Sequence, residues 1–217
     1  MSDISLIHNT INFVKQQLQG AEGGHDWFHI QRVYNNALLI ANGEDCDLNV
    51  VKLGALLHDI ADSKFHAGDE TVGPKLAWEF LERENVPEAT ILQVVNIIEN
   101  ISFKGGNFEK HFHSPELAIV QDADRLDALG AIGIARTFNY GGFINRPIYD
   151  PDIAPNLHMT KEEYKASNAP TLNHFYEKLL LLKDKMNTAT GKQLAENRHA
   201  FMESFLSQFY AEWDGER

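Results

Sequence analysis

Cysteine, long apolar runs and positive charge are all scarce in this 217-residue chain, and each shortage excludes a class of protein. The single cysteine, Cys46, rules out a disulfide within the chain. It lies in the acidic stretch "GEDCDL", which disfavours a nucleophilic thiolate. No apolar segment reaches the ~20 residues that cross a bilayer, and the stretch 1–16 is amphipathic rather than signal-like. We therefore expect a globular protein of the cytoplasm with no membrane partner.

The deficit of positive charge limits the partners further. Nineteen Lys and Arg residues against 31 Asp and Glu residues give a formal net charge of -12. Broad contact with a nucleic-acid backbone needs clustered Lys and Arg, so we expect no extended nucleic-acid surface. A small phosphorylated substrate remains compatible, because a metal ion or a few local cations can invert the field inside one pocket.

Signals for β-strands are also lacking, and helical periodicity takes their place. No segment alternates convincingly between apolar and polar residues over four or more positions, as a strand facing solvent does. Asp26 is a suitable N-cap for one of the helices. The sequence predicts an all-α, single-domain helical bundle over 1–217, with helices at 3–19, 26–42, 48–60, 70–84, 87–101, 115–129, 131–139, 171–186 and 191–213.

One long segment interrupts the helices. Residues 140–169 are rich in glycine, proline, asparagine and aromatic residues, which predicts a long ordered loop before the C-terminal helices at about 170–215. A loop of this length inside a compact domain is usually functional. Its Gly141 and Gly142 permit the backbone conformations that a closing loop needs.

The stretch "LGALLHDIADSKFH" places a histidine and an aspartate at the end of an apolar helix. Burying His58 and Asp59 is costly unless a metal ion, or an internal salt bridge or hydrogen bond, compensates for them. Gly54 lies one turn before His58, and a glycine inside a helix costs ~1 kcal/mol relative to alanine. Its presence predicts the close approach of a partner helix.

Further possible metal ligands lie on other predicted helices. His29 is on the second helix, and "IVQDADRLDALGAIG" supplies Asp122, Asp124 and Asp127. Two imidazoles and two carboxylates without a thiolate suit Mn²⁺, Fe²⁺, Co²⁺ or Zn²⁺ and tolerate Mg²⁺. The alternative is that these residues are satisfied core or capping residues.

Three motifs in this order carry a family resemblance. "HIQRV" from His29, the pair His58-Asp59 and "ADRL" around Asp124 resemble the HD-domain superfamily of metal-dependent phosphohydrolases over about residues 22–140. The wider wording is similar to a bacterial subgroup of small, single-domain HD hydrolases. The resemblance implies hydrolysis of a phosphate ester or anhydride, often in a nucleotide. It also implies a divalent metal ion held by His29, His58, Asp59 and Asp124.

The resemblance suggests one role near the metal, and the chemistry of nearby residues suggests others. Some HD hydrolases place a carboxylate at the position of Asp62 to orient or deprotonate the attacking water, although Asp62 could equally be a plain loop carboxylate. Lys64 meets a phosphate or is solvated, and His25 lines the pocket or supports His29. Arg146 offers a planar fork for phosphate oxygens and Tyr149 a ring for a base.

The loop segment 138–164 is therefore expected to cover the metal site. The alternative is that this loop packs its aromatic residues onto the last two helices. His111 and His113 resemble the extra histidines of two-metal HD enzymes, but their loop context favours a surface role.

Three other functions are alternatives to this prediction. "HDWFH", from His25 to His29, has the spacing of a zinc-peptidase HExxH motif, but it has an aspartate where that motif has glutamate. Cleavage of a cyclic dinucleotide requires a downstream GYP signature in this superfamily, and the chain has none. The remaining alternative is a non-catalytic helical sensor that binds a nucleotide or a metal.

Overall fold

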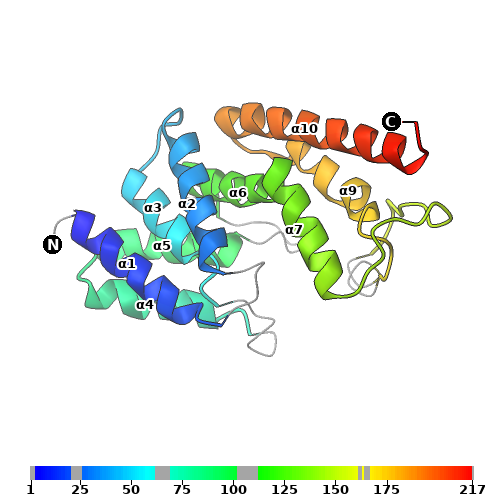
Figure 1. The fold of residues 1–217 in the computed structure, drawn as a ribbon. Helices are drawn as coiled ribbons and strands as arrows, with labels where there is room; N and C mark the ends of the chain where they lie inside the picture. Colours follow the sequence, from blue (N-terminus) through cyan, green and yellow to red (C-terminus); the bar gives the residue numbers. More distant parts are fainter. Residues whose placement is uncertain are drawn as a thin grey trace. The chain divides into compact units, whose positions relative to one another are not determined.

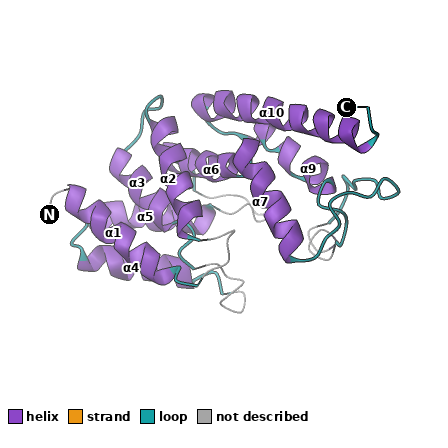
Figure 2. Cartoon of the chain, viewed as in Figure 1, coloured by secondary structure: helices purple, strands orange, loops and turns teal. Residues whose placement is uncertain are grey.

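Every regular element in the described part of the chain is a helix. The computed structural model describes residues 3–20, 26–61, 69–101, 112–160, 163 and 167–216. These residues contain no β-strand (Figure 2), so the all-α prediction is confirmed. None of their helices combines the length and the hydropathy that crossing a bilayer requires.

The chain divides into two compact units, Met1–Asp124 and Arg125–Arg217. The organisation as a single domain stays a prediction. The helices of the first unit (Figure 1) are α1 (Asp3–Gln17), α2 (Trp27–Ala41), α3 (Leu48–Leu57), α4 (Val72–Arg83), α5 (Glu88–Asn100) and most of α6 (Pro115–Asp127).

Helix α3 is the centre of the first unit. It packs against α1, α2 and α5, and its residues from Val50 to Leu57, Lys52 excepted, are buried. A helix that is apolar on almost every side is stable only when other helices surround it. Asp47 begins α3 by accepting hydrogen bonds from the backbone N–H groups of Asn49 and Val50. A buried helix therefore presents its C-terminal end, with His58, inside the unit.

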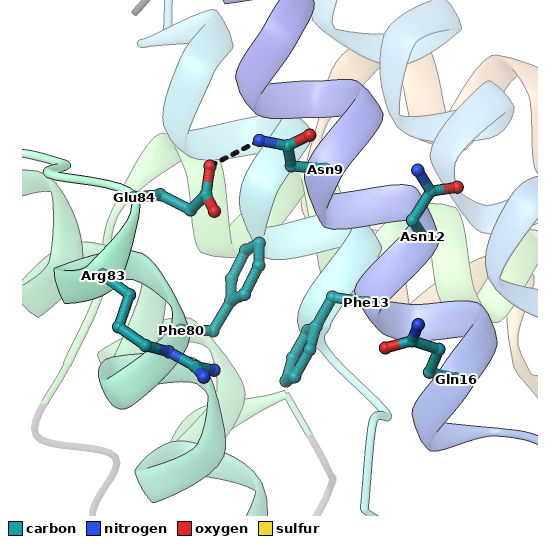
Figure 3. A pocket seen from close by; sticks show the side chains of 7 residues that line it. All are labelled: Asn9, Asn12, Phe13, Gln16, Phe80, Arg83 and Glu84. Atoms are coloured by element: carbon teal, nitrogen blue, oxygen red, sulfur yellow. Dashed lines mark hydrogen bonds between the residues drawn. The ribbon is translucent and has the colours of Figure 1, made fainter.

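Side-chain contacts join α1 and α4 at the edge of this unit (Figure 3). The rings of Phe13 and Phe80 are stacked, with centroids 4.3 Å apart, and Asn9 Nδ2 donates a 2.7 Å hydrogen bond to Glu84. A hollow of about 440 Å³ lies beside them and is lined also by Asn12, Gln16 and Arg83. None of the predicted site residues lines this hollow.

The second unit contains the end of α6, then α7 (Gly130–Phe143), α9 (Asn173–Glu177), two 3₁₀ turns η2 (Leu179–Leu181) and η3 (Lys183–Lys185), and α10 (Ala189–Trp213). Its α10 packs against α7, and the rings of Phe138, Phe175 and Phe205 meet between the helices, with centroids 5.9 Å apart in each pair. Arg198 donates to the carbonyl of Leu126 at 2.5 Å and so ties α10 to the end of α6.

Two boundaries in this unit differ from the predictions. The helix predicted at 171–186 is instead a five-residue helix followed by 3₁₀ turns, because Lys178 has a non-helical backbone (φ -142°). The buried Leu179 and Leu182 then repeat at the three-residue period of a 3₁₀ helix.

The loop predicted at 140–169 begins later, because α7 continues to Phe143 and includes Gly141 and Gly142. Asn145 ends α7 with a left-handed φ of 57°. The backbone N–H groups of Asn145 and Arg146 donate to the carbonyls of Gly142 and Gly141, as in a Schellman motif. The expectation that these two glycines act in a loop backbone is therefore wrong.

Gly141 and Gly142 give a matched pair for testing the packing of α7. A Cβ atom at Gly141 would lie 2.1 Å from Thr171 Oγ1, whereas one at Gly142 would meet nothing within 4 Å. We expect Gly141→Ala to lower the free energy of unfolding by about 1–3 kcal/mol through overpacking. Gly142→Ala should leave it unchanged or raise it by up to ~1 kcal/mol. Urea unfolding followed by circular dichroism measures both, and equal losses in the two variants would contradict this account.

Candidate metal centre

The ends of two helices bring the predicted ligands of the first unit together. Asp26 caps α2 by accepting a 3.0 Å hydrogen bond from the backbone N–H of His29, as predicted, so His29 is fixed in the first turn. His58 is the C-cap of α3, and Asp59 follows it in the turn. Because α2 packs along α3, the start of one helix lies beside the end of the other.

His29, His58 and Asp59 form a cluster with the geometry of a metal site. One ligand atom from each residue lies within 4.8 Å of the others, and both histidines are buried. The two imidazole rings meet edge to face, with centroids 5.4 Å apart. In the described residues this is the one group of three or more His, Cys, Asp or Glu side chains arranged so closely.

The environment of His58 defines which of its ring nitrogens is available. His58 Nδ1 lies 2.9 Å from the backbone carbonyl of Ala55, and a carbonyl only accepts, so Nδ1 carries the proton. Nε2 then holds a lone pair, and this buried atom has no hydrogen-bond partner in the described residues. Burial lowers the pKa of His58 despite the opposing effect of Asp124, so the ring is neutral near pH 7. A neutral imidazole with a free Nε2 is the form that binds a metal ion.

Asp124 reaches the cluster from a third helix. Its Oδ1 atom lies 3.6 Å from His29 Nε2, and its side chain is 43% exposed, in contrast to the buried histidines. It is not part of the group whose ligand atoms all lie within 4.8 Å of one another. Asp124 therefore stands on the exposed side of the cluster, next to His29.

The two other aspartates of α6 have different surroundings. Asp127 is buried in the second unit and forms an ion pair with Arg136, whose Nη1 atom lies 2.6 Å from Asp127 Oδ2. Asp122 is fully buried. Of the three aspartates that the sequence offered, the structure brings Asp124 to His29.

Two tight contacts support the cluster. A Cβ atom at Gly54 would lie 3.1 Å from Ile97 on α5 and 3.5 Å from Val120 on α6, which confirms the predicted close approach. Asn36, on the buried side of α2, donates a 3.2 Å hydrogen bond to the carbonyl of Ala123, the residue before Asp124. Asn36 is not among the predicted site residues, although a polar residue seven positions after His29 on the same apolar face was a usable signal.

Several predicted residues cannot be placed in this way. Asp62, Lys64, His25 and His111 lie outside the described residues, so their assigned roles stay predictions. His113 is described and exposed. The thiol pKa of Cys46 is raised by burial and by Glu116, in agreement with its expected lack of nucleophilicity.

Arg146 and Tyr149 are in the second unit. Arg146 donates to the backbone carbonyl of Ser167, and its Nε atom is buried without a partner in the described residues. Burial is the main cause that lowers the pKa of His174 to about 4, and the charges of Lys178 and Arg146 lower it further.

The ring of Tyr149 packs edge-on against three aromatic residues of α10, Phe209, Tyr210 and Trp213, at centroid distances of 4.9–5.8 Å. This contact agrees with the alternative interpretation, in which the loop packs its aromatic residues onto the C-terminal helices. The stacking of Tyr149 on a substrate base stays a prediction, and so does the cover that residues 138–164 are expected to form over the metal site.

Comparisons with known proteins place this geometry in context. The sequence family described as HD domain matches residues 27–129, which include the cluster and Asp124. The uncharacterized protein YpgQ of Bacillus subtilis is 35% identical over 213 residues, covering 96% of this chain and 94% of YpgQ.

Two crystal structures extend the likeness over the whole chain. An HD-superfamily hydrolase from Bacillus thuringiensis is 44% identical with a TM-score of 0.80, covering 98% of this chain and 99% of that one. YpgQ of Bacillus subtilis in complex with ADP is 32% identical with a TM-score of 0.77, covering 98% of this chain and 97% of that one.

The unpaired Nε2 atom of His58 predicts an unusual stability profile. In protein treated with a chelator, His58→Leu loses one hydrogen bond to Ala55, worth about 1 kcal/mol, but it also removes a buried unpaired polar atom that costs about 1–3 kcal/mol. We expect its free energy of unfolding to stay within about 1 kcal/mol of the parent protein. The neighbouring control, Leu57→Ala, is fully buried and should lose about 2–5 kcal/mol. If His58→Leu loses as much as the control, His58 is a structural residue instead.

Proposed function

The chain belongs to the HD-domain family of hydrolases, and from this premise we propose that it is a metal-dependent phosphohydrolase of nucleotides. The observation that carries the proposal is the neutral, buried His58, whose free Nε2 lies in a cluster with His29 and Asp59. Such a donor set fits a divalent ion, and the choice of N and O donors favours Mn²⁺, Fe²⁺, Co²⁺ or Zn²⁺, with Mg²⁺ tolerated.

The proposed roles combine this cluster with the residues that the sequence analysis predicted. His29, His58, Asp59 and Asp124 would hold the ion, which supplies Lewis-acid polarisation of a phosphoryl oxygen and lowers the pKa of bound water from ~15.7 toward 7. Asp62 would orient the attacking water or accept its proton. Lys64 and Arg146 would balance the charge that grows on the phosphoryl oxygens.

A nucleotide is the proposed substrate for two reasons. The relative YpgQ binds ADP in a crystal structure, and it resembles this chain over nearly its whole length. Arg146 carries a planar fork of N–H donors, which matches the geometry of phosphate oxygens. Tyr149 and His25 are the proposed contacts to the remainder of the substrate.

The activity can be tested with a panel of nucleoside mono-, di- and triphosphates, each combined with one of the five divalent metals. We expect metal-dependent release of phosphate or pyrophosphate, measured separately, and its suppression by a chelator. The double variant His58→Ala/Asp59→Ala should lose both the metal and the activity, whereas Asp62→Ala should keep the metal and lose activity. Metal or nucleotide binding without any turnover by the parent protein would favour the sensor alternative.

Arg146→Ala tests the proposed phosphate contact. Loss of one charge-assisted hydrogen bond costs about 1.5–3 kcal/mol, so kcat/KM should fall roughly ten- to a hundredfold. Arg146→Lys should recover part of the activity, because it keeps the charge but loses the planar fork. The metal Kd and the Tm should hardly change. A loss of activity matched by a loss of Tm would instead assign Arg146 to holding the loop through Ser167.

A further inference from the structure

The position of Asn36 is unusual for an asparagine. It lies within α2, on the side that also carries His29, Val33 and Ile40, and only 9% of its surface is exposed. Asparagine is a weaker helix former than alanine by roughly half a kcal/mol, and burying its amide is costly unless hydrogen bonds compensate. Such a residue needs a specific partner.

The partner lies next to the proposed metal ligand on α6. Asn36 Nδ2 donates a 3.2 Å hydrogen bond to the carbonyl of Ala123, so the peptide that ends in Asp124 is bound directly to α2. His29 starts the same helix, and its Nε2 atom lies 3.6 Å from Asp124 Oδ1. Two contacts between α2 and α6 therefore lie next to each other, one at the carbonyl of Ala123 and one at the side chain of Asp124.

This hydrogen bond fixes the position of α6, and α6 does not need it to complete its own backbone hydrogen bonds. In an α-helix the carbonyl of residue i already accepts from the N–H of residue i+4, so Ala123 has an acceptor bond inside α6 without Asn36. Removing the amide of Asn36 leaves no unsatisfied carbonyl on α6. The consequence falls instead on where α6, and with it Asp124, stands relative to His29.

The other three proposed ligands do not depend on this contact. The backbone N–H of His29 is held by the capping side chain of Asp26, and the ring of His58 is held by the carbonyl of Ala55. Asp59 follows His58 directly in the chain. These three lie on α2 and at the end of α3, which pack together directly. Asp124 is the proposed ligand that depends on the position of α6 relative to α2.

We infer that Asn36 is a positioning residue that holds Asp124 in reach of the metal centre and so governs the affinity for a divalent ion. The inference rests on the proposed metal site and deepens it. Groups that orient a metal ligand typically contribute ten- to a hundredfold to metal affinity. Asn36 is expected to act at the lower end of that range, because it acts on the backbone of one ligand.

The test measures binding of Co²⁺ to the full chain by calorimetry and by its visible absorption spectrum, which reports the coordination of the ion. Asn36→Ala should raise the Kd for Co²⁺ about tenfold and shift the spectrum toward that of Asp124→Ala. Asn36→Leu keeps the branched shape of the side chain without its amide and leaves no cavity, so it separates loss of the hydrogen bond from creation of a cavity. The matched control is Asn35→Ala, because Asn35 is the neighbouring but exposed asparagine of α2, and its Kd should stay within about twofold.

A double-mutant cycle makes the inference specific to Asp124. In an Asp124→Ala background, Asn36→Ala should add no further loss of Co²⁺ affinity, because the residue through which it acts is gone. A full tenfold loss in that background, or a parental Kd in both Asn36 variants, would overturn the inference while the metal site stands. Absence of Co²⁺ binding by the parent protein would overturn the proposed metal site itself, and the inference with it.

Discussion

Burial of His58 at the end of the apolar helix α3 is the constraint on which the packing of the first unit depends. The ring is 6% exposed, its Nδ1 is committed to Ala55, and its Nε2 has no partner in the described residues. An unpaired buried polar atom costs about 1–3 kcal/mol, which is a substantial fraction of the stability of a typical domain. Helix α3 can hold the His58 imidazole in this buried environment because α1, α2 and α5 surround it.

The surrounding helices bring further polar side chains close to this ring. Capping fixes His29 at the start of α2, the glycine at position 54 admits Ile97 and Val120 close to α3, and Asn36 binds the backbone of α6. Each of these contacts is local and inexpensive, but together they direct side chains from three helices toward one point. The proposed metal site depends on this arrangement, because a binding site needs ligands that are held in position before the ion binds.

The second unit is built on aromatic packing and on buried pairing of arginine. Phe138, Phe175 and Phe205 fill the space beside α7 and α10, and Asp127 is neutralised by Arg136. Arg146 donates to the backbone carbonyl of Ser167, and its buried Nε atom has no hydrogen-bond partner within the described part of the chain. That combination is compatible with both a structural role and a role in binding an anion, and stability and activity measurements separate the two.

The sequence by itself determined the helical class, the positions of most helices, the cap at Asp26, the close approach at Gly54 and the family, because periodicity, capping and short motifs are local properties of the chain. Tertiary structure decided what local patterns leave open. Lys178 leaves the helical region so that leucines can be buried at a three-residue spacing, and Thr171 approaches α7 so closely that Gly141 is needed inside a helix. Asp122, Asp124 and Asp127 have the same side chain, so the sequence alone does not distinguish them. Packing of the other helices buries Asp122, places Asp124 beside His29 and pairs Asp127 with Arg136.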